Sequence, residues 1–232
     1  MRTVFFAMVT AFLSAPSYAH SDPVKPVLVE LFTSQACSSC PAADAFMHEL
    51  AARDDVIALA LHVDYWDYLF DDVFGKAAHS KRQYGYAHAA GRRMVYTPQM
   101  IIGGSDEVIG NRPQDVNALI DRHLAAPPTV ALEVQRDGGQ VEITARALTG
   151  GGRPLVVQIA RFIPRQEVAI DKGENAGHVY TYANIVTDLE ELGRWDPAQP
   201  LSLRVQADGD RPVVVILQRP DFGAVEAAAI LR

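Results

Sequence analysis

The stretch that decides the fold runs from residue 27 to residue 41 and reads VLVELFTSQACSSCP. Its first seven residues, Val27–Thr33, are mostly apolar and β-branched or large, which predicts a buried strand. Apolar residues then recur at helical spacing over residues 41–53: Ala42, Ala45, Phe46 and Leu50. Cys37 and Cys40 therefore lie between the end of the predicted strand and the N-terminus of the predicted helix.

This position suits thiol–disulfide exchange. A helix N-terminus presents unpaired N–H groups and the positive end of the helix dipole, and both stabilise a thiolate. The first cysteine gains most from this field, so we expect Cys37 to be the nucleophile and Cys40 to be the resolving thiol. The hydroxyl groups of Ser38 and Ser39 can donate hydrogen bonds to the Cys37 thiolate.

The chain has only two cysteines, and they are three positions apart. A disulfide that closes so short a loop stabilises a protein by roughly 2 kcal/mol, so chemistry explains the pair better than stability does. Two other interpretations stay open, a structural bridge and a metal site. The metal site would need further ligands such as His62, His79 or His88, because a lone pair of cysteines lacks the second ligand pair of a zinc site. We expect no metal and no other cofactor.

The N-terminus indicates export. A basic start at Arg2, an apolar run over residues 4–13 and the small-residue pattern Ser17-Tyr18-Ala19 are typical of a secretory signal cleaved after Ala19. The run is about ten residues long, half of the roughly 20 needed to span a bilayer. We therefore expect a periplasmic or secreted protein with no membrane insertion after cleavage. The net charge of −7 argues against nucleic acid as a partner.

The remaining pattern predicts two domains. Residues 24–126 read as β-α-β-α-β-β-α, a small α/β domain with strands near 57–63, 99–104 and 107–109 and helices near 74–90 and 113–124. Ala126-Pro127-Pro128 resembles a linker, and residues 129–232 then change to short β-rich runs separated by glycine and proline. These runs predict a β-sandwich-like second domain with strands at 130–134, 141–145, 155–162, 179–186, 201–205 and 213–217.

Several motifs resemble known families. The first strand, the Cys37-Ser38-Ser39-Cys40 motif and Thr97-Pro98 before the third strand resemble the thioredoxin superfamily. More closely, five blocks resemble an uncharacterised secreted family called domain of unknown function 1223: residues 30–41, 62–67, 96–99, 173–175 and 180–186. This second resemblance covers nearly the whole chain after residue 19.

The resemblance implies an α/β thioredoxin-like domain in which Pro98 is cis. It also implies that the Thr97 backbone faces the cysteines and pairs with an extended segment of a cysteine-containing protein substrate or redox partner. Glu30 resembles the buried acid that accepts a proton beneath the cysteines in thioredoxins. It lies seven positions before Cys37, one more than is usual there, and the alternative is an exposed strand residue.

Aromatic residues follow the second predicted strand: Tyr65, Trp66, Tyr68 and Phe70. They either form an apolar rim that binds the substrate near the cysteines or pack in the core. The function that the sequence favours is a thiol–disulfide oxidoreductase, with the direction of electron flow open. The alternative is a thioredoxin-like binding module or a metal or thiol carrier without turnover.

Overall fold

The computed structural model of the chain describes residues 25–150, 152–207 and 209–232. The predicted signal segment, residues 1–19, lies outside the described residues. Among the helices that are described, none is long and apolar enough to cross a membrane.

The elements of the first half lie close to their predicted positions. They are, in chain order, β1 (Val27–Thr33), α1 (Pro41–Ala51), β2 (Val56–His62), α2 (Ala77–Ala89), β3 (Gln99–Ile102), β4 (Asp106–Ile109) and α3 (Pro113–Leu124). Helix α1 begins with Pro41 in its first turn, where the missing N–H is not needed, and it buries Phe46, Met47 and Leu50.

The second half consists of strands. They are β5 (Val130–Asp137), β6 (Gln140–Ala147), β7 (Leu155–Ala169), β8 (Val179–Trp195), β9 (Leu201–Gln206), β10 (Val213–Gln218) and β11 (Val225–Leu231). Strands β7 and β8 are 15 and 17 residues long, far longer than their apolar cores predict. The sequence did not predict β11.

The predicted fold class is wrong. A thioredoxin-like α/β domain followed by a separate β-rich domain would need two independent sheets, one from each half. The structure instead has a mixed sheet of eight strands in the order β11-β10-β7-β8-β2-β1-β3-β4, and a second sheet of three strands in the order β5-β6-β9. Only three helices accompany these eleven strands in the described part of the chain, so the protein is β-rich.

The two halves join where β2 meets β8. These strands run parallel and pair at Ala60 and Ile185. Asn184, which has a positive φ of 49°, donates its side-chain N–H to the Ala58 carbonyl oxygen at 2.8 Å. This pairing joins residues more than a hundred positions apart, and hydrophobic periodicity identifies strands without identifying their partners. The boundary at residues 127–128 was predicted from composition, and whether each half folds alone stays a prediction.

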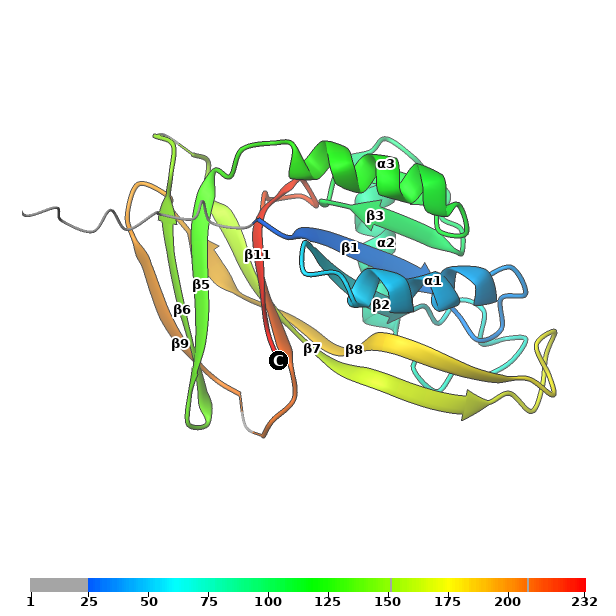
Figure 1. Cartoon of the computed structure of the whole chain (residues 1–232). Coiled ribbons are helices and arrows are strands. Elements are labelled where there is room, and N and C mark those ends of the chain that lie inside the picture. Colours follow the sequence, from blue (N-terminus) through cyan, green and yellow to red (C-terminus); the bar gives the residue numbers. More distant parts are fainter. Residues whose placement is uncertain (1–24, 151, 208) are drawn as a thin grey trace, which may run out of the picture.

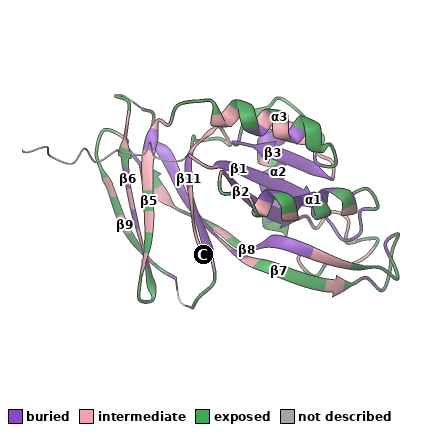
Figure 2. Cartoon of the chain, in the orientation of Figure 1, coloured by how far each residue is buried: buried purple, intermediate pink, exposed green. Residues whose placement is uncertain are grey.

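Helices cover both faces of the N-terminal part of the large sheet (Figure 1). Side chains from α1 and α3 pack on Val29 and Leu31 of β1, whereas Tyr86 of α2 packs on the opposite face with Leu28 and Phe32. The buried residues run through the middle strands, and the helices expose their outer faces (Figure 2).

The three-stranded sheet covers the C-terminal strands of the large sheet. Val141 and Ile143 of β6 pack with Ile159 of β7 and with Val213 and Val215 of β10. In Figure 1 this small sheet stands at the opposite end of the molecule from the tip of the β7–β8 hairpin.

Candidate functional site

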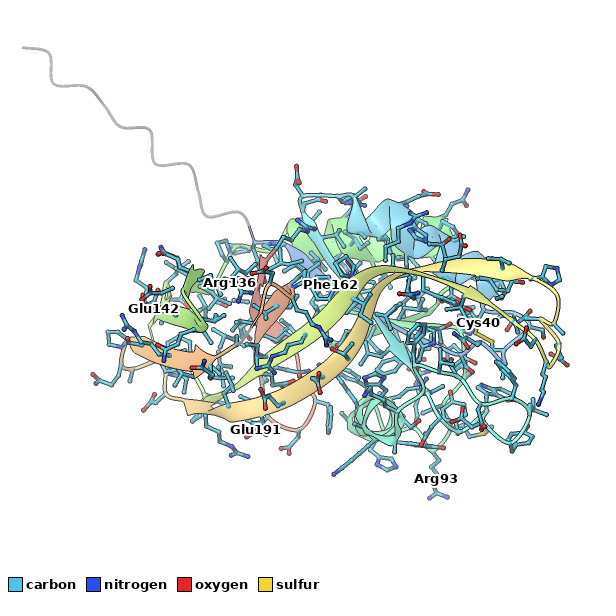
Figure 3. The ribbon with its side chains drawn as sticks, turned by 90° about the horizontal axis from the view of Figure 1, so that it is seen from below. Cys40, Arg93, Arg136, Glu142, Phe162 and Glu191 are labelled. Atoms are coloured by element: carbon cyan, nitrogen blue, oxygen red, sulfur yellow. A yellow bond between two sulfur atoms is a disulfide. The ribbon has the colours of Figure 1, made fainter. Side chains whose placement is uncertain are left out.

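Cys37 and Cys40 form a disulfide at the start of α1. Cys37 is 5 % exposed and Cys40 is fully buried, while Ser38 and Ser39 between them are exposed. Cys40 is the N-cap residue of α1 and has no side-chain capping bond. The site lies near the tip of the β7–β8 hairpin, where Figure 3 places Cys40 on the far side of Phe162 from the three-stranded sheet.

Ser39 links the disulfide to the loop before β3. Its Oγ lies 3.4 Å from Cys37 Sγ, and it donates a long hydrogen bond of 3.5 Å to the Thr97 carbonyl oxygen. The Thr97–Pro98 peptide bond is cis, as predicted. The structure therefore brings Cys37, Thr97 and Pro98 together, although residues 37 and 97 are sixty positions apart.

The predicted aromatic residues lie beside Thr97. Trp66 donates its indole N–H to Thr97 Oγ1 at 2.9 Å and stacks on Tyr68, whose ring centroid is 6.2 Å away. Tyr68 is 77 % exposed, and Tyr65 and Trp66 are half-buried. We call these three side chains the aromatic rim. Tyr65 and Trp66 also pack against the core cluster that contains Phe32 and Leu61, so both interpretations hold in part.

The β7–β8 turn holds the cysteine loop from the other half of the chain. The Asn175 side-chain amide donates to the carbonyl oxygens of Gln35 and Cys37 at 2.8 and 3.1 Å, and Asn175 is 6 % exposed. Gly173 and Gly177 in this turn have φ values of 78° and 82°, a conformation that strains other residues. The block at residues 173–175 therefore positions the site.

Glu30 is buried but does not join the cysteines. Its side chain projects from the face of β1 that α2 covers, and α1 packs on the other face. Arg82 donates to it at 2.6 and 3.1 Å, and the Tyr86 hydroxyl donates to it at 2.5 Å. This paired carboxylate gives no support to the role of proton acceptor for the cysteines.

The described residues contain no group of three or more His, Cys, Asp and Glu side chains that could hold a metal ion. All three histidines considered as ligands have other contacts, and the His88 ring lies 6.4 Å from the Tyr84 ring. His62 Nδ1 lies 2.7 Å from Asp72 Oδ2, and His79 Nδ1 lies 2.8 Å from the His62 carbonyl oxygen. The metal interpretation therefore has no geometric support in this part of the chain.

Sequence reasoning missed a buried polar cluster beside the disulfide, which we call the Asp44 cluster. It comprises Thr33, Gln35, Asp44, His62 and Asp72. Asp72 accepts hydrogen bonds from the backbone N–H groups of Gln35 and Phe74 at 2.7 and 2.9 Å. No sequence signal finds this cluster, because an aspartate in the first turn of a helix is common on electrostatic grounds alone.

The two carboxyl groups of the Asp44 cluster have opposite pKa shifts. Burial raises the pKa of Asp44 to about 7, against the lowering influence of His62 and of the nearby Thr33 hydroxyl. Thr33 lies near Asp44 without a hydrogen bond of normal geometry. Burial also opposes ionisation of Asp72, but His62 and the backbone donors outweigh it and lower the pKa of Asp72.

A hollow of about 380 Å³ reaches this cluster from outside. It lies between α1 and the start of β8, and its lining residues are Pro41, Asp44, Ala45, His48, Arg165, Val179, Tyr180 and Thr181. His48 Nε2 lies 2.8 Å from the Thr181 carbonyl oxygen and joins the two walls. Asp44 therefore belongs to the buried cluster and also lines the hollow.

The fold and the site define a class of protein: a β-rich chain on a mixed sheet, with a Cys-x-x-Cys disulfide at a helix N-terminus. The chain belongs to the family described as protein of unknown function DUF1223, whose family model matches residues 28–218. The comparison with curated proteins gave no match.

Two solved structures resemble the chain. A crystal structure of an Agrobacterium tumefaciens protein shares 32% sequence identity and has a TM-score of 0.78, over 91% of this chain and 96% of that one. HBP35 of Porphyromonas gingivalis shares 15% identity and has a TM-score of 0.65, over 91% of this chain and 76% of that one. The second likeness shows a shared fold only.

Proposed function

We propose that this chain is a thiol–disulfide oxidoreductase that acts on a cysteine-containing protein through Cys37 and Cys40. The observation that carries the proposal is the placement of the disulfide: it lies at a helix N-terminus, beside the Ser39 hydroxyl and the Thr97–Pro98 backbone. A helix N-terminus stabilises a thiolate at Cys37, and a buried Cys40 is protected until a mixed disulfide forms.

The exchange reaction balances with these two sulfur atoms. In the reduced protein the Cys37 thiolate attacks one sulfur of a substrate disulfide, a mixed disulfide forms, and the other substrate sulfur leaves as a thiolate. The Cys40 thiolate then attacks Cys37 Sγ and expels the second substrate thiolate. Two electrons pass from the protein dithiol to the substrate, and the reverse sequence oxidises a substrate dithiol.

The aromatic rim is the proposed substrate surface. An extended substrate segment would pair with the Thr97 backbone and lay an apolar side chain on Trp66 and Tyr68. Tyr65 supports this surface from behind, since its hydroxyl donates to Gln83 Oε1 at 3.0 Å. The substrate side chain would then cover the exposed face of the Tyr68 ring.

The test is the equilibrium reduction potential of the Cys37–Cys40 pair, titrated against glutathione and dithiothreitol. A value near −120 mV identifies an oxidant, and a value near −270 mV identifies a reductant that needs an electron donor. Cys40→Ser should accumulate a mixed disulfide with a protein substrate, whereas Cys37→Ser should not. Absence of any reversible couple contradicts the proposal and favours a binding module without turnover.

We also propose that the protein works outside the cytoplasm, in the periplasm or as a secreted protein. The basic start, short apolar run and Ser17-Tyr18-Ala19 pattern support this proposal. Expression of the full chain followed by N-terminal sequencing of the product tests it. A mature chain that begins at His20 is expected, and an uncleaved chain retained in the cytoplasm contradicts it.

A further inference from the structure

The polar atoms that the fold leaves without partners gather beside the disulfide. Within the residues that the structure describes, every buried side-chain nitrogen or oxygen lacking a hydrogen-bond partner belongs to one of four residues: Thr33, Gln35, Asp44 and His62. An unpaired buried polar group costs about 1–3 kcal/mol. Such groups are rare in native structures and call for a specific explanation. Their concentration in one place indicates a site.

Asp44 is the member of this site nearest to Cys40 along the chain. Cys40 is the N-cap residue of α1, and Asp44 lies four positions later on the same side of the helix. The Asp44 backbone N–H donates to the Cys40 carbonyl oxygen at 3.0 Å. Asp44 Oδ1 and His62 Nε2 are both buried and unpartnered, while Asp72 fixes the other ring nitrogen of His62.

We propose that Asp44, backed by the His62–Asp72 pair, is the proton store of the cysteine pair. This inference rests on the proposed exchange function and deepens it. When the mixed disulfide is resolved, the proton of the Cys40 thiol passes to the Asp44 carboxylate, and the Cys40 thiolate attacks Cys37 Sγ. When the disulfide is reduced, the same proton returns from Asp44 to the Cys40 thiolate as Cys40 leaves.

The surroundings of Asp44 suit this exchange. A group that gives and takes a proton near neutral pH needs a pKa close to that pH, and burial brings the pKa of Asp44 to about 7. From the interior, His62 lowers the pKa of Asp44 and Asp72 raises it. The Tyr182 hydroxyl faces Asp44 from β8. His48 and Arg165 line the hollow on its outer side, and His79 Nδ1 of α2 lies 2.8 Å from the His62 carbonyl oxygen.

The hollow between α1 and β8 connects Asp44, the proposed proton store, with solvent. Asp44 lines this hollow of about 380 Å³, so a proton taken from Cys40 has a route to solvent that does not cross the substrate side at Thr97. The route matters during turnover, because a bound substrate would cover Cys37 and the aromatic rim while Cys40 loses its proton.

The experiment compares the full mature protein with Asp44→Asn, and uses Glu49→Gln as the matched control. Glu49 is an exposed acid on the same helix, so its amide variant changes charge without touching the cluster. The reduced proteins are mixed with oxidised glutathione, quenched at intervals, and the mixed disulfide and the closed Cys37–Cys40 disulfide are counted by mass spectrometry across pH.

In the wild-type protein and in Glu49→Gln, the closure rate should rise through an inflection near the pKa of Asp44, about 7. Asp44→Asn should lose this inflection and close on the order of 100-fold more slowly at neutral pH. Its rate should approach the wild-type rate at alkaline pH, where the Cys40 thiol ionises without help. An unchanged inflection in Asp44→Asn overturns the proton store and leaves the exchange function intact.

A second measurement needs no variant and no exchange. The carboxyl carbon of Asp44, followed by NMR in the oxidised wild-type protein, should titrate near pH 7, and titration near its ordinary pKa of 3.8 overturns the store. If the wild-type protein forms no mixed disulfide with any disulfide probe, the exchange function fails, and the store fails with it.

Discussion

Asp44 places an ionisable carboxyl group on the buried face of α1. Its neighbours on that face are apolar, and the unfolded chain would hydrate it fully. Folding therefore favours its protonated form. An ionised carboxyl group at this buried position lowers the free energy of unfolding at neutral pH. Such a loss of stability is common for groups that serve a chemical function.

The expected consequence is a stability that depends on pH. The pKa of Asp44 is about 7 in the folded protein and near 3.8 in the unfolded chain, so the folded state binds more protons between these values. Its contribution is fully present below about pH 4 and is lost as pH rises through 7, a difference of up to about 4 kcal/mol. Asp44→Asn should therefore be more stable than the wild-type protein at pH 8.

Urea unfolding at pH 5 and pH 8 measures this difference, with Glu49→Gln as the control. The gain in the free energy of unfolding from Asp44→Asn should be larger at pH 8 than at pH 5. Equal gains at the two pH values would show that the folded protein leaves Asp44 ionised throughout.

Glu30 is also a buried acid, but its carboxylate is paired with Arg82 and Tyr86. We therefore expect a substitution there to lower stability, the opposite of the effect expected for Asp44. Glu30→Gln leaves the Arg82 guanidinium buried without its counter-charge, and such a change costs about 3–5 kcal/mol. Because Glu30 lies on the opposite face of β1 from α1, the reduction potential of the cysteine pair should not change. Thermal unfolding and the glutathione titration check the two parts, and a shifted potential would return Glu30 to the redox site.

At the residue scale, sequence predicted the part of the site that a motif encodes. Short motifs mark the cysteine pair and Thr97–Pro98, and the resemblance implied that these distant motifs face each other, with Pro98 in the cis form that the structure has. Asp44 and His62 were missed as a pair. They are eighteen positions apart on different elements, and only burial distinguishes them from surface residues.

At the scale of elements, the β7–β8 hairpin extends from the small sheet to the cysteine loop. Its strands were predicted, but their length and their pairing with β2 were not. Side-chain alternation reveals a strand wherever one face is buried, yet it carries no information about which edge the strand joins. The predicted boundary rests on composition alone, since Pro127-Pro128 has the composition of a linker whichever sheet the later strands join.

Asn175 is the residue through which this hairpin acts on the site. Asn175→Ala leaves the buried carbonyl oxygens of Gln35 and Cys37 without its two hydrogen bonds, which should cost about 1–3 kcal/mol. The cysteine loop should also open more often, so dithiothreitol should reduce the disulfide faster. Glu174→Ala, an exposed change in the same turn, is the control for both measurements. Equal reduction rates in the two variants would limit Asn175 to a structural role.

At the scale of the whole molecule, one buried network joins both halves. Arg82 of α2 binds Glu30 of β1, and it also donates to Gln158 of β7 at 2.9 Å and to Gln218 of β10 at 3.3 Å. The core around it is shared in the same way, since Phe32 and Leu61 pack in one cluster with strands of the second half.

We therefore expect residues 25–126 not to fold when produced alone. The fragment would expose the face of β1 and β2 that the second half covers, and Arg82 would lose two of its partners. Far-UV circular dichroism and the dispersion of amide NMR signals measure the outcome, with the full mature chain as reference. A well-dispersed spectrum from the fragment would confirm the domain boundary predicted from the sequence.

The turn between β7 and β8 has a consequence for how this family evolves. Turns that join hairpin strands usually accept insertions and deletions freely, because solvent surrounds them. Here Asn175 must reach two carbonyl oxygens across the cysteine loop, so the number of residues in the turn is fixed by the chemistry it supports. Across natural relatives, length should vary at the exposed β5–β6 turn at Gly138 and Gly139, and it should stay constant between residues 170 and 178.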